Sequence, residues 1–561
     1  MNDYNNLYKL WLDKCDDEVL LEELKSIDGD DEAILDRFYK SLQFGTAGLR
    51  GVLGAGTNRM NIYTVNQATQ GVADYLNANF DNPTVAIAYD SRINSDLFAK
   101  ETAGVFAANG IKAYIYKELV PTPMLSFAVR KLGCASGVII TASHNPAKYN
   151  GYKCYDPEGY QMTDEAADAA YQFIQKVDMF ADVKRKSFEE GLSDGSIEYI
   201  SDEVYEEFFD LVQAKNINPE ACAKANLKVI FTPLNGTGNK PVQKILKRIG
   251  VTDVTVVPEQ ENPDGNFPTC PYPNPEIRQA FECALALARK TGADLLLATD
   301  PDCDRVGIAV KDGDDYTLMS GNEVGALMTE YVLSQYKEKG IMPADPVVVE
   351  SIVTTDLVKA IAADYGARVQ NTLTGFKYIG EFVTSLEKEG REDNYIVGME
   401  ESYGYLLGTH ARDKDAVVAS QLICEMASYY KLQGLSLLEK MKELYAKHGI
   451  YINKVESFEF EGASGMDKMA NIMSYVRDNA PSTVAGLPVV EAIDYKNSEA
   501  TGLPASNVLA FKLPAGAGII VRPSGTEPKL KFYITATGKT FEEATELYEK
   551  ILENGKIWLK V

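Results

Sequence analysis

At 561 residues the chain is far longer than one hydrophobic core normally fills, so we expect several domains. Its composition, 45% apolar and 24% charged, is that of a globular protein without a membrane span, and a formal net charge of −25 counts against nucleic-acid binding. Eight scattered cysteines without CxxC pairs and an N-terminus without secretory features favour a cytoplasmic protein.

From about residue 83 the sequence alternates short apolar strands with helical segments, which is the pattern of βαβ units in a mostly parallel sheet. A first round contains strands at 83–90, 111–116 and 136–141 and helices at 95–109 and 124–132. A second round contains strands at 227–232, 254–257 and 295–298 and a helix at 276–290. A third round contains helices at 323–336 and 355–365 and strands at 347–351 and 368–372.

Residues from about 452 onward follow a different pattern, with strands at 454–460, 518–521 and 530–537 and a closing helix at 541–553. This order indicates a smaller α+β module. The predicted fold class is therefore α/β, with three similar α/β domains of mixed, mostly parallel sheets and a smaller C-terminal α+β domain. The predicted domains are 1–205, 206–320, 321–450 and 451–561.

The first polar loop after a strand is Thr-Ala-Ser-His-Asn-Pro at 141–146, with Lys153 shortly behind it. Ligands of α/β sheets bind where strands end, and a serine there can act as a nucleophile. Lys153 could move a proton or hold a phosphate. An Asn-Pro turn with a capping serine is the structural alternative, and the motif alone does not separate the two.

The second loop, 300–305, places Asp300, Asp302 and Asp304 directly after an apolar strand. Like charges this close oppose joint ionisation, and a divalent cation relieves the conflict. Oxygen-only ligands suit Mg²⁺ better than Zn²⁺. An EF-hand is excluded, because Arg305 stands where that loop needs glycine. A phosphatase-type nucleophile at Asp302 stays open, as does a solvated acidic turn.

Two further loops carry groups that can bind a sugar phosphate. Gly-Met-Glu-Glu-Ser-Tyr-Gly at 398–404 offers carboxylates and a hydroxyl for sugar hydroxyls, although such loops are usually only solvated. Arg-Pro-Ser-Gly-Thr-Glu-Pro-Lys at 522–529 offers a guanidinium fork and hydroxyl donors for a phosphate, where the alternative is a plain polar hairpin. Arg50 and Lys377 each sit beside a glycine-containing turn, and alone each is more typical of an ordinary surface turn.

Together and in this order, from about residue 40 to the C-terminus, these loops resemble the α-D-phosphohexomutase superfamily, and more closely its phosphoglucomutase-like branch. The resemblance implies four domains around one central cleft. It also implies an intramolecular phosphotransferase that interconverts hexose 1-phosphate and hexose 6-phosphate through a phosphoserine and a bound 1,6-bisphosphate. Mg²⁺ would be the cofactor and glucose 1,6-bisphosphate the activator.

The resemblance assigns roles to individual residues. Ser143 would carry the phosphoryl group and, with Asp300, Asp302 and Asp304, complete the Mg²⁺ shell, while Lys153 and Arg50 lie where proton transfer is placed. Contacts to the substrate would come from Arg305, Thr374, Lys377, Glu400, Ser402 and Lys414. The loop gripping the non-reacting phosphate would contain Arg522, Ser524, Gly525 and Thr526.

The sugar preference rests on one departure from the family pattern. The loop reads Glu-Glu-Ser-Tyr-Gly instead of the Glu-Met-Ser-Gly-His of dual mannose/glucose enzymes, which favours glucose phosphate. Phosphomannomutase, phosphopentomutase and glucose-1,6-bisphosphate synthase stay open, and the alternative from a different class is a non-catalytic sugar-phosphate sensor. Expected partners are small sugar phosphates, with neither nucleic acid nor membrane, for a monomer or homodimer.

Overall fold

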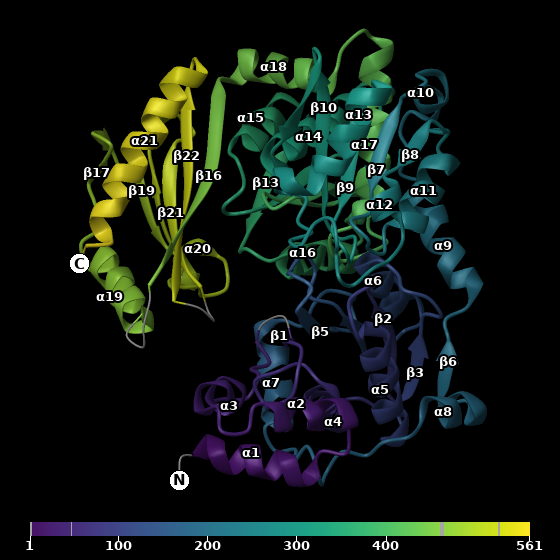
Figure 1. The fold of residues 1–561 in the computed structure, drawn as a ribbon. Helices are drawn as coiled ribbons and strands as arrows, with labels where there is room; N and C mark the ends of the chain where they lie inside the picture. The colour runs from purple at the N-terminus through teal and green to yellow at the C-terminus, as the bar shows by residue number, and fades with distance from the viewer. Residues whose placement is uncertain (1–2, 46–47, 461–464, 525–527, 561) are drawn as a thin grey trace. The chain divides into compact units, whose positions relative to one another are not determined.

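The computed structural model describes residues 3–45, 48–460, 465–524 and 528–560 (Figure 1). The chain forms two compact units. The first unit contains Met1–Met319, Ile379–Glu392 and Tyr403–Gly434, and the second unit contains Ser320–Tyr378, Asp393–Ser402 and Leu435–Val561. No helix in the described ranges combines the length and apolar character that crossing a bilayer requires.

The first sheet of the first unit has the strand order β1-β5-β4-β2-β3-β6. Its bounds are β1 (Leu49–Val52), β5 (Tyr149–Tyr155), β4 (Ser136–Ile140), β2 (Thr84–Tyr89), β3 (Lys112–Ile115) and β6 (Ile197–Tyr199). The strands β4, β2, β3 and β6 pair in parallel, whereas β5 is antiparallel to both β4 and β1. The predicted parallel strands β2, β3 and β4 are confirmed, but β1, β5 and β6 were not among the predicted strands.

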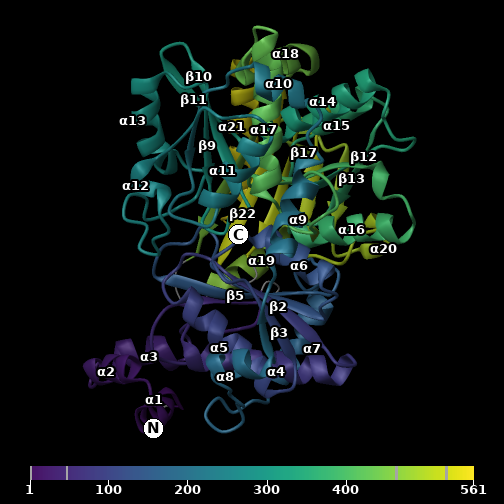
Figure 2. The ribbon, with the colours of Figure 1, turned by 90° about the vertical axis from the view of Figure 1, so that its right-hand side faces the viewer.

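Helices cover both faces of this sheet. Figures 1 and 2 show α4, α5 and α7 on one face and α6 on the other, and the first three contribute to one core with the strands. The helices of this part are α4 (Ile62–Asn79), α5 (Ser95–Ala108), α6 (Thr122–Lys131), α7 (Asp164–Ile174), α8 (Phe188–Asp194) and α9 (Asp202–Gln213). The expected domain boundary at 205 falls within α9, and the domain limits stay predictions.

The second sheet of the first unit has the strand order β11-β10-β9-β7-β8. The strands β9, β7 and β8 pair in parallel. The strand β10 pairs antiparallel with β9, and β11 pairs antiparallel with β10. The strands are β11 (Asp315–Met319), β10 (Val306–Asp312), β9 (Leu295–Thr299), β7 (Val229–Thr232) and β8 (Val254–Val256). Accompanying elements are α10 (Pro219–Lys224), α11 (Asn239–Arg248), α12 (Pro258–Glu261), η1 (Arg278–Phe281), α13 (Glu282–Thr291), β15 (Gly404–Leu406) and α17 (Ala416–Leu432).

One predicted helix begins later than expected. The pattern predicts a helix from Glu276, but the backbone N–H of Glu276 donates to Asn274 Oδ1 at 3.0 Å and that of Ile277 to Asn274 O at 3.1 Å. These bonds form a turn, followed by the 3₁₀ segment η1 and then α13. The side-chain turn of an asparagine competes here with helix formation.

Three N-terminal helices share a hydrophobic core with residues near the start of α4. They are α1 (Asp3–Lys14), α2 (Glu18–Ser26) and α3 (Asp31–Phe38). Trp11 is only 1% exposed, and its ring lies edge-on to Phe38, Tyr63 and Phe180 at centroid distances of 5.9, 5.3 and 5.5 Å. Such edge-to-face contacts add to the burial energy of the large rings. The N-terminal segment is therefore an integral part of the first unit.

The second unit contains a parallel sheet and an antiparallel one. The parallel pairs join β13 (Arg368–Thr372), β12 (Val347–Ser351) and β14 (Tyr395–Glu400), accompanied by α14 (Gly321–Lys339), α15 (Leu357–Asp364) and α18 (Leu437–His448). The antiparallel sheet has the order β16-β22-β21-β20-β19. Its strands are β16 (Ile450–Glu459), β22 (Lys529–Gly538), β21 (Gly518–Pro523), β20 (Leu509–Lys512) and β19 (Glu491–Asp494).

The helices α19 (Gly465–Asp478) and α21 (Phe541–Trp558) lie on one face of the antiparallel sheet (Figure 1). Ile472 of α19, Phe532 of β22 and Ile551 of α21 are fully buried in a common core. Short elements complete the part: β17 (Thr483–Val484), β18 (Leu487–Pro488), α20 (Ser498–Thr501) and η3 (Pro514–Gly516). The predicted smaller C-terminal α+β module is confirmed.

Candidate active site

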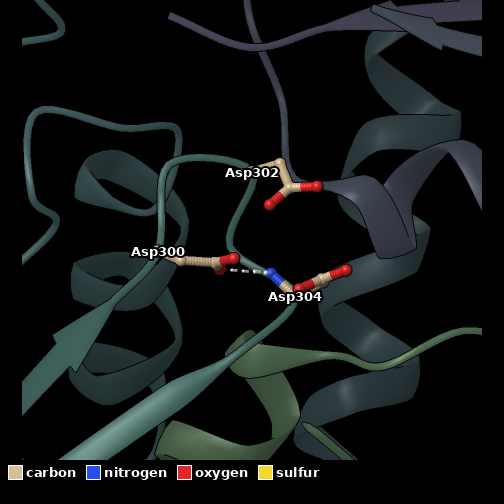
Figure 3. A group of neighbouring side chains, drawn as sticks. All are labelled: Asp300, Asp302 and Asp304. Carbon is tan, nitrogen blue, oxygen red and sulfur yellow. Dashed lines mark hydrogen bonds between the residues drawn. The ribbon is translucent and has the colours of Figure 1, made fainter. Parts of the chain in front are cut away.

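The loop between β9 and β10 gathers three buried carboxylates. Asp300 and Asp302 are fully buried and Asp304 is 2% exposed, and one oxygen of each lies within 4.8 Å of the others (Figure 3). Asp300 Oδ1 accepts hydrogen bonds from the backbone N–H groups of Asp304 at 3.1 Å and Arg305 at 3.0 Å. Cys303, at the tip, has a φ of +52°, which lets the chain reverse within these few residues.

Two lysines partly neutralise these carboxylates. Lys153 Nζ lies 2.9 Å from Asp302 Oδ2 and 4.0 Å from Asp304 Oδ2, and Lys414 Nζ lies 3.1 Å from Asp304 Oδ2. Burial, followed by repulsion from Asp302, raises the pKa of both Asp300 and Asp304. Burial also opposes ionisation of Asp302, but the Lys153 ammonium and hydrogen bonds outweigh it and hold the pKa of that carboxyl below its ordinary value.

A divalent cation fits this arrangement. Asp302 Oδ1 and Asp304 Oδ1 are buried and accept no hydrogen bond within the described residues. Such orphaned carboxylate oxygens are costly unless a cation compensates them. The donor set consists of oxygens only, which suits a hard ion. The three aspartates predicted as metal ligands are therefore brought together and can hold a metal.

Ser143 reaches the same cluster from the loop after β4. Its side chain is 4% exposed, and its hydroxyl donates to Asp300 Oδ2 at 2.8 Å. His144 Nδ1 lies 3.2 Å from the same hydroxyl. Burial and the nearby guanidinium groups, first Arg305 and then Arg50, lower the pKa of His144 well below its ordinary value. This imidazole is therefore neutral near pH 7, so His144 adds no positive charge beside the Ser143 hydroxyl.

Lys153 reaches the carboxylates because β5 pairs with β4, which sets Lys153 opposite Ile139. Every residue of β5 after Tyr149 is buried, so the polar side chains of this strand point into the protein. Periodicity alone missed this strand because its sequence, Tyr-Asn-Gly-Tyr-Lys-Cys-Tyr, has no apolar alternation.

Three other basic residues of the first unit were also predicted to belong to the site. Arg50 is exposed on β1, and its Nη1 donates to Asn145 Oδ1 at 3.3 Å on the serine loop. Arg305 is half-buried, with Nη1 2.7 Å from Glu276 Oε1. Lys414, a predicted substrate contact, pairs with Asp413 at 2.7 Å in addition to its ion pair with Asp304.

Thr122 is a site residue that sequence reasoning missed. It begins α6, and its backbone N–H donates to Asp302 O at 2.9 Å while its hydroxyl donates to Asp302 Oδ2 at 3.0 Å. The signal available was a Pro-Thr-Pro segment after the strand β3, at the same edge of the sheet as Ser143.

In the second unit, Glu400 lies close to the turn that precedes α16 (Phe376–Lys388). Its Oε1 accepts a hydrogen bond from the backbone N–H of Gly375 at 2.8 Å, so Glu400 lies beside the segment that contains Thr374 and Lys377. Lys377 is 7% exposed and Ser402 is half-buried. Glu400 itself ends the strand β14, whose residue Met399 still pairs with Glu350 of β12.

In the second unit, Arg522 belongs to the end of β21 (Gly518–Pro523), and Ser524 directly follows this strand. Arg522 is half-buried, with Nη1 3.5 Å from the Tyr533 hydroxyl, and the Ser524 N–H donates to Lys529 O at 2.7 Å. Gly525 and Thr526 lie outside the described residues. The two strands predicted on either side of this loop are present as the antiparallel pair β21 and β22.

Comparisons with known proteins agree with this arrangement. The models of the α/β/α domains I, II and III of phosphoglucomutase/phosphomannomutase match residues 41–180, 206–313 and 320–448. A phosphoglucomutase from Staphylococcus saprophyticus is 34% identical over 551 residues, which cover 96% of this chain and 98% of the relative.

Solved structures share the fold. A phosphoglucomutase/phosphomannomutase family protein from Burkholderia thailandensis has a TM-score of 0.69 at 17% identity, with 92% of this chain and 96% of the other covered. Parafusin, a phosphoglucomutase from Paramecium, has a TM-score of 0.70 at 16% identity, with 93% and 95% covered. The chain belongs to the phosphoglucomutase/phosphomannomutase family.

Proposed function

We propose that this chain is a phosphoglucomutase, which interconverts glucose 1-phosphate and glucose 6-phosphate through a phosphoryl group carried on Ser143. The observation that carries the proposal is the 2.8 Å hydrogen bond from the Ser143 hydroxyl to Asp300, inside a buried cluster of three aspartates. A nucleophile held at a metal-binding cluster is what phosphoryl transfer needs, because that reaction depends on positioning and charge stabilisation. The near full-length relatives named phosphoglucomutase support glucose as the sugar.

Asp300, Asp302 and Asp304 would hold Mg²⁺ together with an oxygen on Ser143. Bound there, the cation would neutralise charge that develops on the transferring phosphoryl group. The orphaned oxygens of Asp302 and Asp304 support this assignment, and the choice of Mg²⁺ rests on the oxygen-only donor set.

In the first half-reaction, the bond between phosphorus and Ser143 Oγ breaks while phosphorus bonds to the free hydroxyl of the hexose monophosphate. The product is a 1,6-bisphosphate, which turns end for end in the site. In the second half-reaction the other phosphate returns to Ser143. Each transfer removes one proton from the accepting hydroxyl and returns one to the leaving oxygen, and we assign this proton handling to Lys153, with Arg50 beside the serine loop.

The remaining site residues would bind the sugar phosphate. Glu400 and Ser402 suit the sugar hydroxyls, and Thr374, Lys377, Lys414 and Arg305 would contribute polar and cationic contacts. The turn with Arg522, Ser524, Gly525 and Thr526 would grip the phosphate that does not react, since a guanidinium fork matches phosphate geometry. Glucose 1,6-bisphosphate would act as activator, because it can reload an unphosphorylated Ser143.

We further propose a cytoplasmic monomer or homodimer. The presence of eight cysteines, all as free thiols, supports a reducing compartment. Light scattering after gel filtration measures the mass in solution, and a trimer or larger assembly would contradict this part of the proposal.

The test is a panel of sugar 1-phosphates containing glucose, mannose, ribose and N-acetylglucosamine, assayed with Mg²⁺ and a bisphosphate activator. We expect the largest kcat/KM for glucose 1-phosphate. A preference for mannose or ribose would reassign the chain to phosphomannomutase or phosphopentomutase. Net accumulation of glucose 1,6-bisphosphate would indicate a synthase, and binding without turnover of any member would indicate a sugar-phosphate sensor.

A further inference from the structure

The loop that carries Ser143 is held by a buried arginine that neither the motifs nor the proposed chemistry uses. Arg92 is 3% exposed and follows the strand β2. Its Nη1 donates to Pro146 O and Tyr149 O, both at 3.0 Å, and its Nη2 donates to Ser143 O at 2.5 Å and to Asn145 O. One guanidinium therefore bonds to four backbone carbonyls of the 143–149 segment.

The same short segment also fixes the other side of Ser143. The backbone N–H of Ser143 donates to Thr141 Oγ1 at 2.8 Å, and the Thr141 hydroxyl donates to Asp90 Oδ2 at 2.6 Å. Asp90 in turn lies 3.4 Å from Arg92 Nε. Both the N–H and the C=O of Ser143 are thus anchored to the Asp90–Arg92 pair, directly or through Thr141.

This anchoring matters because Ser143 is strained. Its φ is +50°, in the left-handed region that costs a non-glycine residue about 1–2 kcal/mol. Strained residues at functional sites persist only where the surroundings hold them. The conformation held here is the one in which the hydroxyl donates to Asp300.

The 262–275 loop, from the part of the first unit that contains the three aspartates, packs against this arginine. The ring of Phe267 lies over the Arg92 guanidinium at 5.0 Å, a distance suited to cation–π attraction. Gly265 lies against the turn 91–93 that contains Arg92, so close that a Cβ on Gly265 would be 2.5 Å from Ile93 N. The 262–275 loop therefore shields Arg92 from water and ties the turn after β2 to the domain of the aspartates.

We propose that Arg92 is a positioning residue for phosphoryl transfer: it holds the 143–149 loop in the strained conformation that keeps the Ser143 hydroxyl at the metal cluster. The inference rests on the proposed function for its kinetic consequence, while the effect on the loop itself is independent of it. Lysine cannot replace the arginine, because a single ammonium does not span four carbonyls.

The experiment compares Arg92→Ala and Arg92→Lys with the wild-type full chain, using glucose 1-phosphate and Mg²⁺. We expect kcat to fall about 100-fold in Arg92→Ala, since a 1 Å displacement of a reacting group costs about that much, with KM within about threefold. Millimolar methylguanidinium should raise kcat of Arg92→Ala about tenfold or more, and it should not raise kcat of Arg92→Lys. Arg92→Lys should keep the buried charge and still lose most of the activity.

Arg130→Ala is the matched control, because Arg130 also donates to a backbone carbonyl, Thr409 O at 2.9 Å, which lies outside the 143–149 segment. Hydrogen exchange of the 141–149 peptide gives a readout that needs no turnover, and we expect faster exchange in Arg92→Ala than in Arg130→Ala. If the wild type itself lacks mutase activity, the proposed function fails, and the exchange comparison still decides the role of Arg92. An unchanged exchange rate, or a folded Arg92→Lys with wild-type kcat, would overturn the inference.

Discussion

The serine and aspartate loops of the first unit are held very differently from the loops of the second unit that we propose to bind the sugar phosphate. Ser143 bonds to Asp300, Lys153 to Asp302 and Thr122 to Asp302, across sequence separations of 157, 149 and 180 residues. In the second unit, Glu400 bonds to a backbone group 25 residues away. Long-range bonds between buried polar groups fix one geometry, whereas local bonds fix only the shape of a loop. We therefore expect changes in the first set to lower kcat and changes in the second set to raise KM.

The strongest test of this difference replaces one serine in each unit. Ser143→Ala removes the hydroxyl that we propose carries the phosphoryl group, so kcat should fall by about 10⁴-fold or more. Ser402→Ala removes at most one neutral hydrogen bond to the sugar and should raise KM about three- to tenfold. Steady-state kinetics with glucose 1-phosphate measure both, and similar losses in the two variants would contradict the division.

Lys153→Met breaks a buried ion pair and removes the proposed proton handler. We expect kcat to fall about 10²–10⁴-fold, the usual contribution of general acid–base catalysis. Lys131→Met is the control, because Lys131 makes a partly exposed ion pair with Glu207 at 2.6 Å. A Lys153→Met variant with wild-type kcat would exclude Lys153 from proton transfer.

Arg522→Ala tests the proposed phosphate-binding role of the segment after β21. A hydrogen bond from a charged group contributes about 1.5–3 kcal/mol, so KM for glucose 1-phosphate should rise about 10- to 100-fold while kcat stays within about threefold. Arg477→Ala, which loses a pair with Asp494 at 2.7 Å in the same C-terminal domain, should change neither. A fall in kcat without a change in KM would move Arg522 from binding to chemistry.

The two units also differ in how they treat buried carboxylates. Lys153 and Lys414 form ion pairs with the aspartates of the first unit at 2.9 and 3.1 Å. Glu350 on β12 is also fully buried, but its carboxylate accepts a hydrogen bond from Asn371 Nδ2 at 3.2 Å, and Lys359 Nζ lies 3.7 Å away. Burial raises the pKa of Glu350 to about 8. Glu350 therefore keeps its proton in the folded state when the unfolded chain has already lost it.

This shift fixes the sign of a pH effect. Between the ordinary glutamic pKa of about 4.5 and about 8, the folded state binds more protons, so Glu350 lowers stability progressively as pH rises through that window. Glu350→Gln removes this dependence, and we expect its unfolding midpoint to exceed that of the wild type by about 3 °C more at pH 8 than at pH 5. For the exposed control Glu499→Gln, the difference in unfolding midpoint from the wild type should be the same at pH 5 and pH 8. If the difference for Glu350→Gln were also the same at both pH values, that result would contradict the raised pKa of Glu350.

Ser143 and the three aspartates could be predicted because each group directly follows an apolar strand, and such strand ends collect at one edge of a sheet. Local periodicity shows those strands clearly. The fold class followed from the same alternation of strands and helices, together with the family resemblance.

The residues that sequence missed act through long-range pairing. Thr122 and Arg92 bond to loops far away in the sequence, and the predicted Lys153 reaches Asp302 from β5, an antiparallel strand that shows no apolar alternation. The aromatic core around Trp11 joins the first forty residues to α4, a contact that no local pattern encodes. These features depend on which buried polar and aromatic groups meet in three dimensions.

The most direct measurement of the central claim is mass spectrometry of the intact chain and its peptides after incubation with Mg²⁺ and glucose 1,6-bisphosphate. We predict one phosphoryl group, found on Ser143, absent from Ser143→Ala and lost to glucose 1-phosphate when that substrate is added. A phosphoryl group on Asp302, or turnover with Ser143 unmodified throughout, would contradict the account.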